Sequence, residues 1–206
     1  MEPFRSVRGG GVRVWLAAAE ASLLRNLVGQ VMDLIGLQDS PGSQDSPGSQ
    51  DSTGSQDSTV PRDPDITAPD DLAHLEAMLH KPGSTVAPED PVLARLLPDA
   101  YRDDPEAAGE FRMYTEPALR SAKQEAARQL LDSLPEAGGR IQLTQDQALA
   151  WLKALNDVRL ALGTKLGVTE EFEQEWAKLK PDDPQWAAYE VYAWLGAVQE
   201  SLVQAL

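Results

Sequence analysis

Two polar residues interrupt the apolar face of a predicted helix, and both could bind a partner group. After Thr144, hydrophobic residues recur at the three- and four-residue spacing of a helix. At about 100° per residue, Arg159 falls inside the apolar arc and Asn156 lies at its flank. An unpaired buried guanidinium is costly, so Arg159 needs an acceptor. We favour an internal polar network that fixes the helix register; the alternative is a partly open notch for a partner's carboxylate.

Three cations lie on neighbouring turns of an earlier predicted helix. Arg120, Lys123 and Arg128 are interleaved with Glu116 and Glu125. This pattern favours a solvated helix face crossed by ion pairs between residues three or four apart. The alternative is a contact with phosphate groups or with an acidic partner.

Aromatic residues crowd the last predicted helix. An apolar stripe already occupies one face of this helix, and Trp194 and its aromatic neighbours extend onto other faces as well. Burial against the N-terminal helix is the ordinary interpretation. An aromatic face left for a partner, with Trp194 in it, is the alternative.

Other residues of the types used in catalysis have structural explanations. The pairs Asp103/Asp104 and Asp182/Asp183 each precede a proline, which is typical of a helix N-cap. His74 and His80 are six residues apart, unlike the spacing of a zinc-binding helix. The sequence contains no nucleophile-elbow, phosphate-loop or dinucleotide motif. We therefore expect no enzyme activity, no metal and no cofactor.

Composition narrows the remaining functions. The 206 residues carry a net charge of −15, which disfavours a general nucleic-acid binder and an anionic membrane surface. The chain has no cysteine, which excludes disulfides, thiolate nucleophiles and cysteine-ligated metals. No apolar run is long enough to span a membrane, and Val14–Ala19 is too short for a signal peptide. We expect a cytoplasmic protein.

The elements that must position these residues are mainly helices. Residues 4–7 and 12–16 flank Gly9–Gly11 and predict a β hairpin, followed by a helix over 18–37. Residues 38–59 repeat the hexapeptide QDSPGS, so we predict an acidic, disordered insertion over 38–66. Because 37 residues rarely fold alone, we expect residues 1–37 to dock on a helical body formed by 67–206 as one domain.

Start signals divide this body into helices. We expect helices to begin at Asp70 or Asp71, Asp90, Asp104, Thr115, Thr144, Thr169 and Asp183. Thr115 is included because Pro117 suits a first helical turn better than an interior. The predicted fold is mostly α: a small N-terminal β hairpin packed on a multi-helix bundle.

Two strings in this body are distinctive: DPVLARLLPDAYRDDPEAAGEFR, which starts at Asp90, and LNDVRLALG, which starts at Leu155. With Tyr192-x-Trp194-Leu195, they resemble an actinobacterial family, formerly a domain of unknown function, of AosR-type oxidative-stress transcriptional regulators. The resemblance covers nearly the whole chain outside the repeat.

The resemblance implies a cytoplasmic regulator of stress-responsive transcription that acts through a sigma factor of RNA polymerase. Members are often encoded near a ClpS-type proteolytic adaptor, so an adaptor role is one alternative. DNA binding through Arg120, Lys123 and Arg128 is another. This chain departs from the family's redox character because it has no cysteine for a disulfide switch.

Overall fold

The glycine-rich turn forms a hairpin, as predicted. This computed structural model describes residues 2–36, 83–180, 182–183 and 185–206. In it, β1 (Arg5–Ser6) pairs antiparallel with β2 (Val12–Leu16). Gly11 has φ +89, and a Cβ there would lie 2.2 Å from the carbonyl oxygen of Leu143. Only glycine fits this conformation and this close approach.

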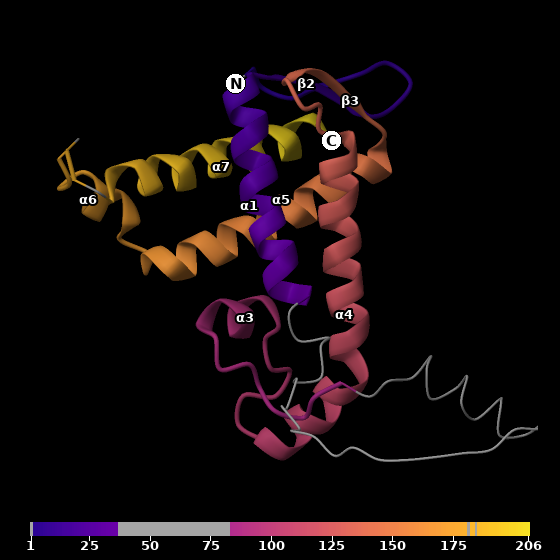
Figure 1. Ribbon diagram of the computed structural model, residues 1–206, viewed down its shortest axis with the longest axis vertical. Coiled ribbons are helices and arrows are strands. Elements are labelled where there is room, and N and C mark those ends of the chain that lie inside the picture. The colour runs from indigo at the N-terminus through magenta and orange to yellow at the C-terminus, as the bar shows by residue number, and fades with distance from the viewer. Residues whose placement is uncertain (1, 37–82, 181, 184) are drawn as a thin grey trace, which may run out of the picture. The chain divides into compact units, whose positions relative to one another are not determined.

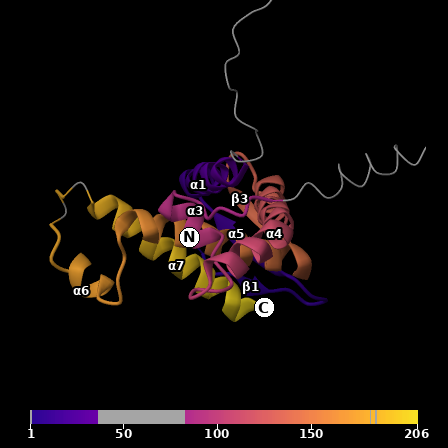
Figure 2. The ribbon, with the colours of Figure 1, turned by 90° about the horizontal axis from the view of Figure 1, so that it is seen from below.

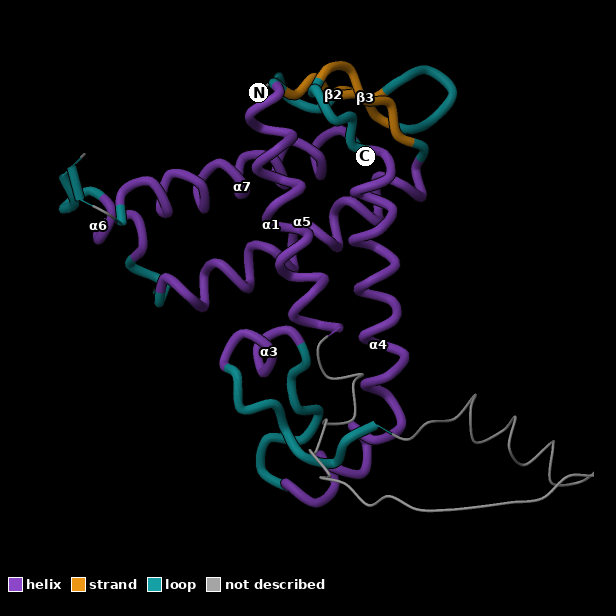
Figure 3. The backbone as a smooth tube through the Cα atoms, in the orientation of Figure 1, coloured by secondary structure: helices purple, strands orange, loops and turns teal. Residues whose placement is uncertain are grey.

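A third strand completes the sheet, so the expectation of a single hairpin is incomplete. β3 (Gly139–Leu143) pairs antiparallel with β2, which is therefore the central strand (Figure 3). Ile141 and Leu143 are buried and alternate with exposed Arg140 and Gln142. This short alternation is a strand signal, but its partner strand lies more than 120 residues away in the sequence.

The rest of the described chain is helical, which confirms the predicted mostly-α class. The helices are α1 (Ala18–Gly36), α3 (Pro91–Leu96), α4 (Pro105–Ser133), α5 (Gln145–Leu166), α6 (Phe172–Trp176) and α7 (Trp186–Ala205). The helix α5 contacts α1, α3, α4, α7 and β3, and it passes between α4 and α7 (Figures 1 and 2). It is therefore buried on more than one side.

Hydrophobic side chains from the sheet and from all the helices except α6 form one core. The inward residues of β2, the apolar stripe of α1 and the face of α5 around Trp151 meet there. The predicted stripe of α7 is confirmed, because Leu195, Val198 and Leu202 are fully buried. Met1–Leu37 and Gly83–Leu206 belong to one compact unit.

Three predicted helix starts are confirmed by their caps. The Asp90 carboxylate accepts hydrogen bonds from two backbone N–H groups of α3, and Asp104 accepts one from Ala107. Thr144 and Gln147 form a reciprocal capping box at the start of α5.

The predicted helix start at Thr115 is wrong, because α4 continues through Pro117. Proline lacks the N–H that would bond to the carbonyl of Met113. The backbone N–H of Gly83 donates to that carbonyl instead, at 2.8 Å. The hydroxyl of Thr115 donates back to the carbonyl of Phe111 rather than capping a helix. A neighbouring segment thus compensates for the interior proline.

The helices predicted to start at Thr169 and Asp183 begin later than expected, and the one predicted from Thr169 is also shorter than expected. Thr169 accepts from the N–H of Glu171, but the helix itself, α6, covers only Phe172–Trp176 before the chain continues in turns. Asp183 accepts from the N–H of Gln185, and α7 starts at Trp186. The predictions for the repeat, for the helix from Asp70 or Asp71, and for His74 and His80 lie outside the described residues.

Candidate functional site

The first two predicted cations of α4 are not on a solvated face. Arg120 is buried: its Nε donates to Glu116 at 2.8 Å, and its Nη1 donates to the carbonyl of Ile35 at 2.6 Å. That carbonyl belongs to the last turn of α1, where unsatisfied acceptors favour a cation. Glu116 also pairs with Arg112, which bonds in addition to Asp99. Arg120 thus ties α4 to α1.

Lys123 is paired with a carboxylate that the sequence pattern did not single out. Its Nζ lies 2.6 Å from Oδ1 of Asp157, and the two side chains are 16% and 7% exposed. Burial has the largest effect and keeps the pKa of Asp157 above its usual value, although the hydrogen bond and charge of Lys123 partly lower it. This pair joins α4 to α5.

Only Arg128 matches the expected solvated face. Its guanidinium is exposed and pairs with Glu125 and Asp132 on the same helix. Of the three predicted cations, one therefore presents its charge at the surface, and its own helix already supplies the counter-charges.

The two polar residues of α5 have different surroundings: Asn156 departs from the predicted buried network, whereas Arg159 has an acceptor inside the chain. Asn156 is exposed, so it is not part of a buried network. Arg159 is half-buried; its Nη1 donates to Oε1 of Gln199 at 2.8 Å, and its guanidinium lies 5.2 Å from the ring centre of Tyr192. The acceptor is thus a neutral amide on α7. Trp194 is half-buried and packs against the core rather than standing free.

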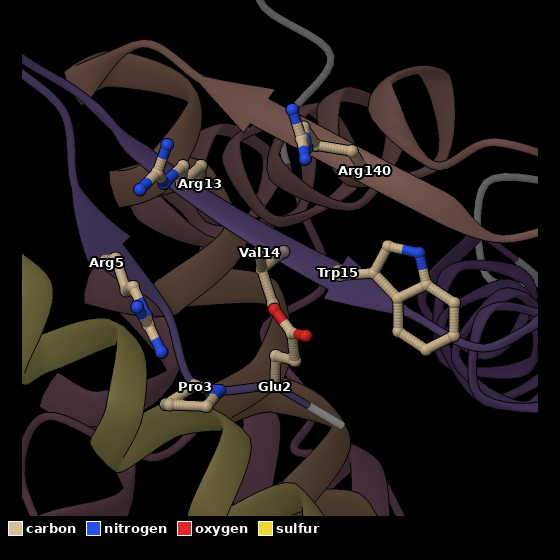
Figure 4. A pocket seen from close by; sticks show the side chains of 7 residues that line it. All are labelled: Glu2, Pro3, Arg5, Arg13, Val14, Trp15 and Arg140. Carbon is tan, nitrogen blue, oxygen red and sulfur yellow. The ribbon is translucent and has the colours of Figure 1, made fainter.

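A surface that the sequence analysis did not identify carries unpaired cations. Arg13 lies at the centre of the outer face of the sheet, opposite Arg5 on β1, and Trp15 lies opposite Arg140 on β3. We call Arg5, Arg13, Trp15 and Arg140 the Arg–Trp face. These four side chains line one depression of about 440 Å³. Figure 4 shows the three guanidinium groups and the indole on this face.

The positive charges of the Arg–Trp face are not compensated within the described chain. Within the described chain none of its three arginines has an ion pair or a side-chain hydrogen bond, although Glu2 lines the same depression. Arg5 and Arg13 are like charges directly opposite on neighbouring strands, an arrangement that destabilises a sheet. An acidic group placed over the face would remove this repulsion.

The Arg–Trp face is composed of residue types that are common in macromolecular contacts. Arginine and tryptophan are enriched among residues that dominate binding energy, and Trp15 is 45% exposed. Guanidinium groups bind carboxylates or phosphates in a bidentate manner. The local signal was the alternation of Arg13 and Trp15 with buried Val12, Val14 and Leu16, but Arg140 joins them only through the sheet.

The parts of the chain that the structure describes contain neither a cluster of metal-ligating side chains nor a membrane-spanning helix. No group of three or more histidine and carboxylate side chains there is arranged to hold a metal ion. No helix there combines the length and apolarity needed to cross a bilayer.

Comparisons with known proteins identify relatives. A protein of Mycobacterium bovis named oxidative stress regulator AosR is 37% identical over 211 residues, covering 96% of this chain and 83% of its own length. A protein of Mycobacterium leprae named putative oxidative stress regulator AosR is 34% identical over 214 residues, covering 98% and 85%. No solved structure matches. The family model described as domain of unknown function DUF2017 matches residues 1–206, and the chain therefore belongs to this family.

Proposed function

We propose that the protein is a non-enzymatic regulator of stress-responsive transcription that acts by protein–protein contact, with a sigma factor or RNA polymerase as its partner. The names of the mycobacterial relatives support a role in oxidative stress. The Arg–Trp face supports action by contact, since it is an exposed surface with unsatisfied charge.

The charges of this protein indicate two properties of its partner, one at the contact and one at longer range. At the contact itself, Arg5, Arg13 and Arg140 require carboxylates on the partner. At longer range, the net charge of −15 favours a partner with positive potential, such as a protein that binds nucleic acid. A partner with a positive overall potential and carboxylates at the contact meets both conditions.

The chain has to receive the stress signal without a thiol. With no cysteine, it has no sulfenic acid or disulfide to form. Met32 is half-buried in the core and Met113 lies in α4. Oxidation of a methionine forms no cross-link, so it is a weak substitute for a disulfide switch. We therefore propose that oxidation is sensed by another component and that this protein transmits the response.

DNA binding through α4 has less support. Two of its three proposed phosphate contacts, Arg120 and Lys123, are held in ion pairs inside the protein. Binding of DNA phosphate rests on free cations, and the charge of Arg128 is already compensated. A role as an adaptor in proteolysis remains the other alternative.

Affinity purification of the full chain from its native host, with and without oxidant, tests the proposal. We expect wild-type protein to recover a sigma factor or RNA polymerase, and Arg13→Glu/Arg140→Glu to lose it. The matched control is Lys153→Glu/Lys178→Glu, which makes the same charge change at two exposed lysines away from the sheet.

Three results contradict parts of this proposal. Failure of the wild type to recover any polymerase component under either condition refutes the partner. Equal recovery by both double variants refutes the Arg–Trp face as the contact. A gel shift of DNA that weakens steeply with salt and disappears in Arg128→Glu revives the DNA-binding alternative.

A further inference from the structure

A second pocket lies away from the sheet, between α5, α6 and α7. It has a volume of about 500 Å³, within the usual range for small-molecule sites. Arg159 on α5, Phe172 and Trp176 on α6, and Tyr192 on α7 supply its main side chains. The lining residues come from α5, from α7 and from the segment around α6 that connects these two helices. Figure 1 shows α6 between the end of α5 and the start of α7.

Two side chains that line this pocket carry buried hydrogen-bond donors without an acceptor. They are Nε of Arg159 and the indole Nε1 of Trp176. Buried donors are almost always satisfied, and each exception calls for an explanation. Arg159 donates through Nη1 to Gln199, and the edge formed by Nε and Nη2 has no acceptor among the described residues. This edge is one of the two on which a guanidinium holds a carboxylate through parallel bonds.

The guanidinium is held in place before any ligand arrives. Tyr192 lies on one side of it at 5.2 Å, and Gly196 lies close by, where an added Cβ would be 3.7 Å from Nη2. With Nη1 fixed by Gln199, little side-chain freedom remains to be lost on binding.

The other walls are aromatic, with carboxylates at the rim. Phe172 stacks on Tyr189 with ring centres 5.2 Å apart, and Trp176 packs against Trp186. The exposed side chains of Glu170 and Glu171 also line the pocket. Their charges disfavour dianions such as phosphate esters and leave a singly charged ligand as the better fit.

We propose that this pocket binds a monocarboxylate with a flat or branched apolar body, its carboxylate on Arg159 and its body against Phe172 and Trp176. The carboxylate can belong to a free organic acid or to the C-terminus of a peptide. The site is separate from the Arg–Trp face and does not depend on the proposed partner.

Titration of the full chain, followed by tryptophan fluorescence and calorimetry, tests this site. The probes are phenylacetate, isovalerate and N-acetylphenylalanine, the last as a mimic of a peptide C-terminus. We expect at least one of them to bind, phenylacetamide to bind at least about tenfold more weakly than phenylacetate, and phenyl phosphate to bind no better. Tighter binding of N-acetylphenylalanine than of the free acids assigns the site to a C-terminus.

Variants of the pocket test whether the ligand binds there. Arg159→Met is expected to weaken binding by about ten- to hundredfold, as loss of hydrogen bonds to a charged group does, whereas Lys153→Met at an exposed position of the same helix leaves it unchanged. Ala193→Leu adds bulk to the α7 wall of the pocket and reduces binding while keeping Arg159, so the test holds even if Arg159→Met does not fold. No binding by any of the three acids at about 10 mM, or equal binding of phenylacetate and phenylacetamide, overturns the proposal.

Discussion

Replacing Lys123 by methionine tests whether the α4–α5 ion pair is a buried structural element. The change keeps the apolar stem but removes the terminal ammonium group, which leaves the Asp157 carboxylate without its counter-charge. Removing one partner of a buried pair costs about 3–5 kcal/mol of unfolding free energy. Because 16% of the Lys123 side chain is exposed and water can reach the site, we expect a value near the lower end, about 3 kcal/mol.

The cost of Lys123→Met should depend on pH. Burial raises the pKa of Asp157 above its ordinary value of 3.8, and without Lys123 nothing in the pair opposes that rise. A raised folded-state pKa means that the folded protein binds the proton more tightly than the unfolded chain. The penalty is therefore absent below about pH 3.8, grows as pH rises through the folded-state pKa, and is complete above it.

Urea unfolding of both proteins at pH 7 and near pH 4 measures this difference. The double variant Lys123→Met/Asp157→Leu is the control, since it removes both charges and should recover most of the loss. A cost below about 1 kcal/mol at pH 7, as for an exposed pair, would refute the buried-pair argument. So would a cost that is equal at the two pH values, or a double variant no more stable than the single one.

Three further changes have expected outcomes that thermal or urea unfolding can measure. Gly11→Ala should destabilise the sheet by more than about 1 kcal/mol, because the residue has φ +89 and its Cβ would lie 2.2 Å from a backbone oxygen; Gly9→Ala, with φ +96 but open space around it, should cost less, and equal losses would contradict the steric argument. Thr144→Ala should cost about 1 kcal/mol through loss of the cap of α5, and no measurable loss would show that the capping box is not needed. Ser133→Ala leaves the buried indole N–H of Trp151 without its acceptor at 2.7 Å and should cost about 1–3 kcal/mol, whereas a neutral result would mean that water replaces the hydroxyl.

Local features of this chain could be predicted from its sequence. The caps at Asp90, Asp104 and Thr144 each bond to a backbone N–H two or three residues away, so the neighbouring sequence determines them. The hairpin at Gly9–Gly11 is local for the same reason. The apolar stripe of α7 follows from helical periodicity alone.

Features that join distant segments needed the tertiary structure. Pro117 is tolerated inside α4 because Gly83, from another part of the chain, donates to the carbonyl that proline leaves free. Asp157 lies opposite the apolar arc of α5, yet it is buried because α4 covers that side and supplies Lys123. A helical projection shows which residues share a face, but it does not show how many faces are covered.

The two proposed binding surfaces also differ in how much of each could be predicted from the sequence. The sequence identified Arg159 as a residue that needs an acceptor, because the burial cost of a guanidinium follows from its position in an apolar pattern. Only the structure showed that Gln199 accepts from Nη1, that Nε has no acceptor among the described residues, and that Arg159 lines a pocket. The Arg–Trp face could not be predicted, because Arg140 joins Arg13 and Trp15 through strand pairing across more than 120 residues, and such pairing depends on the whole core.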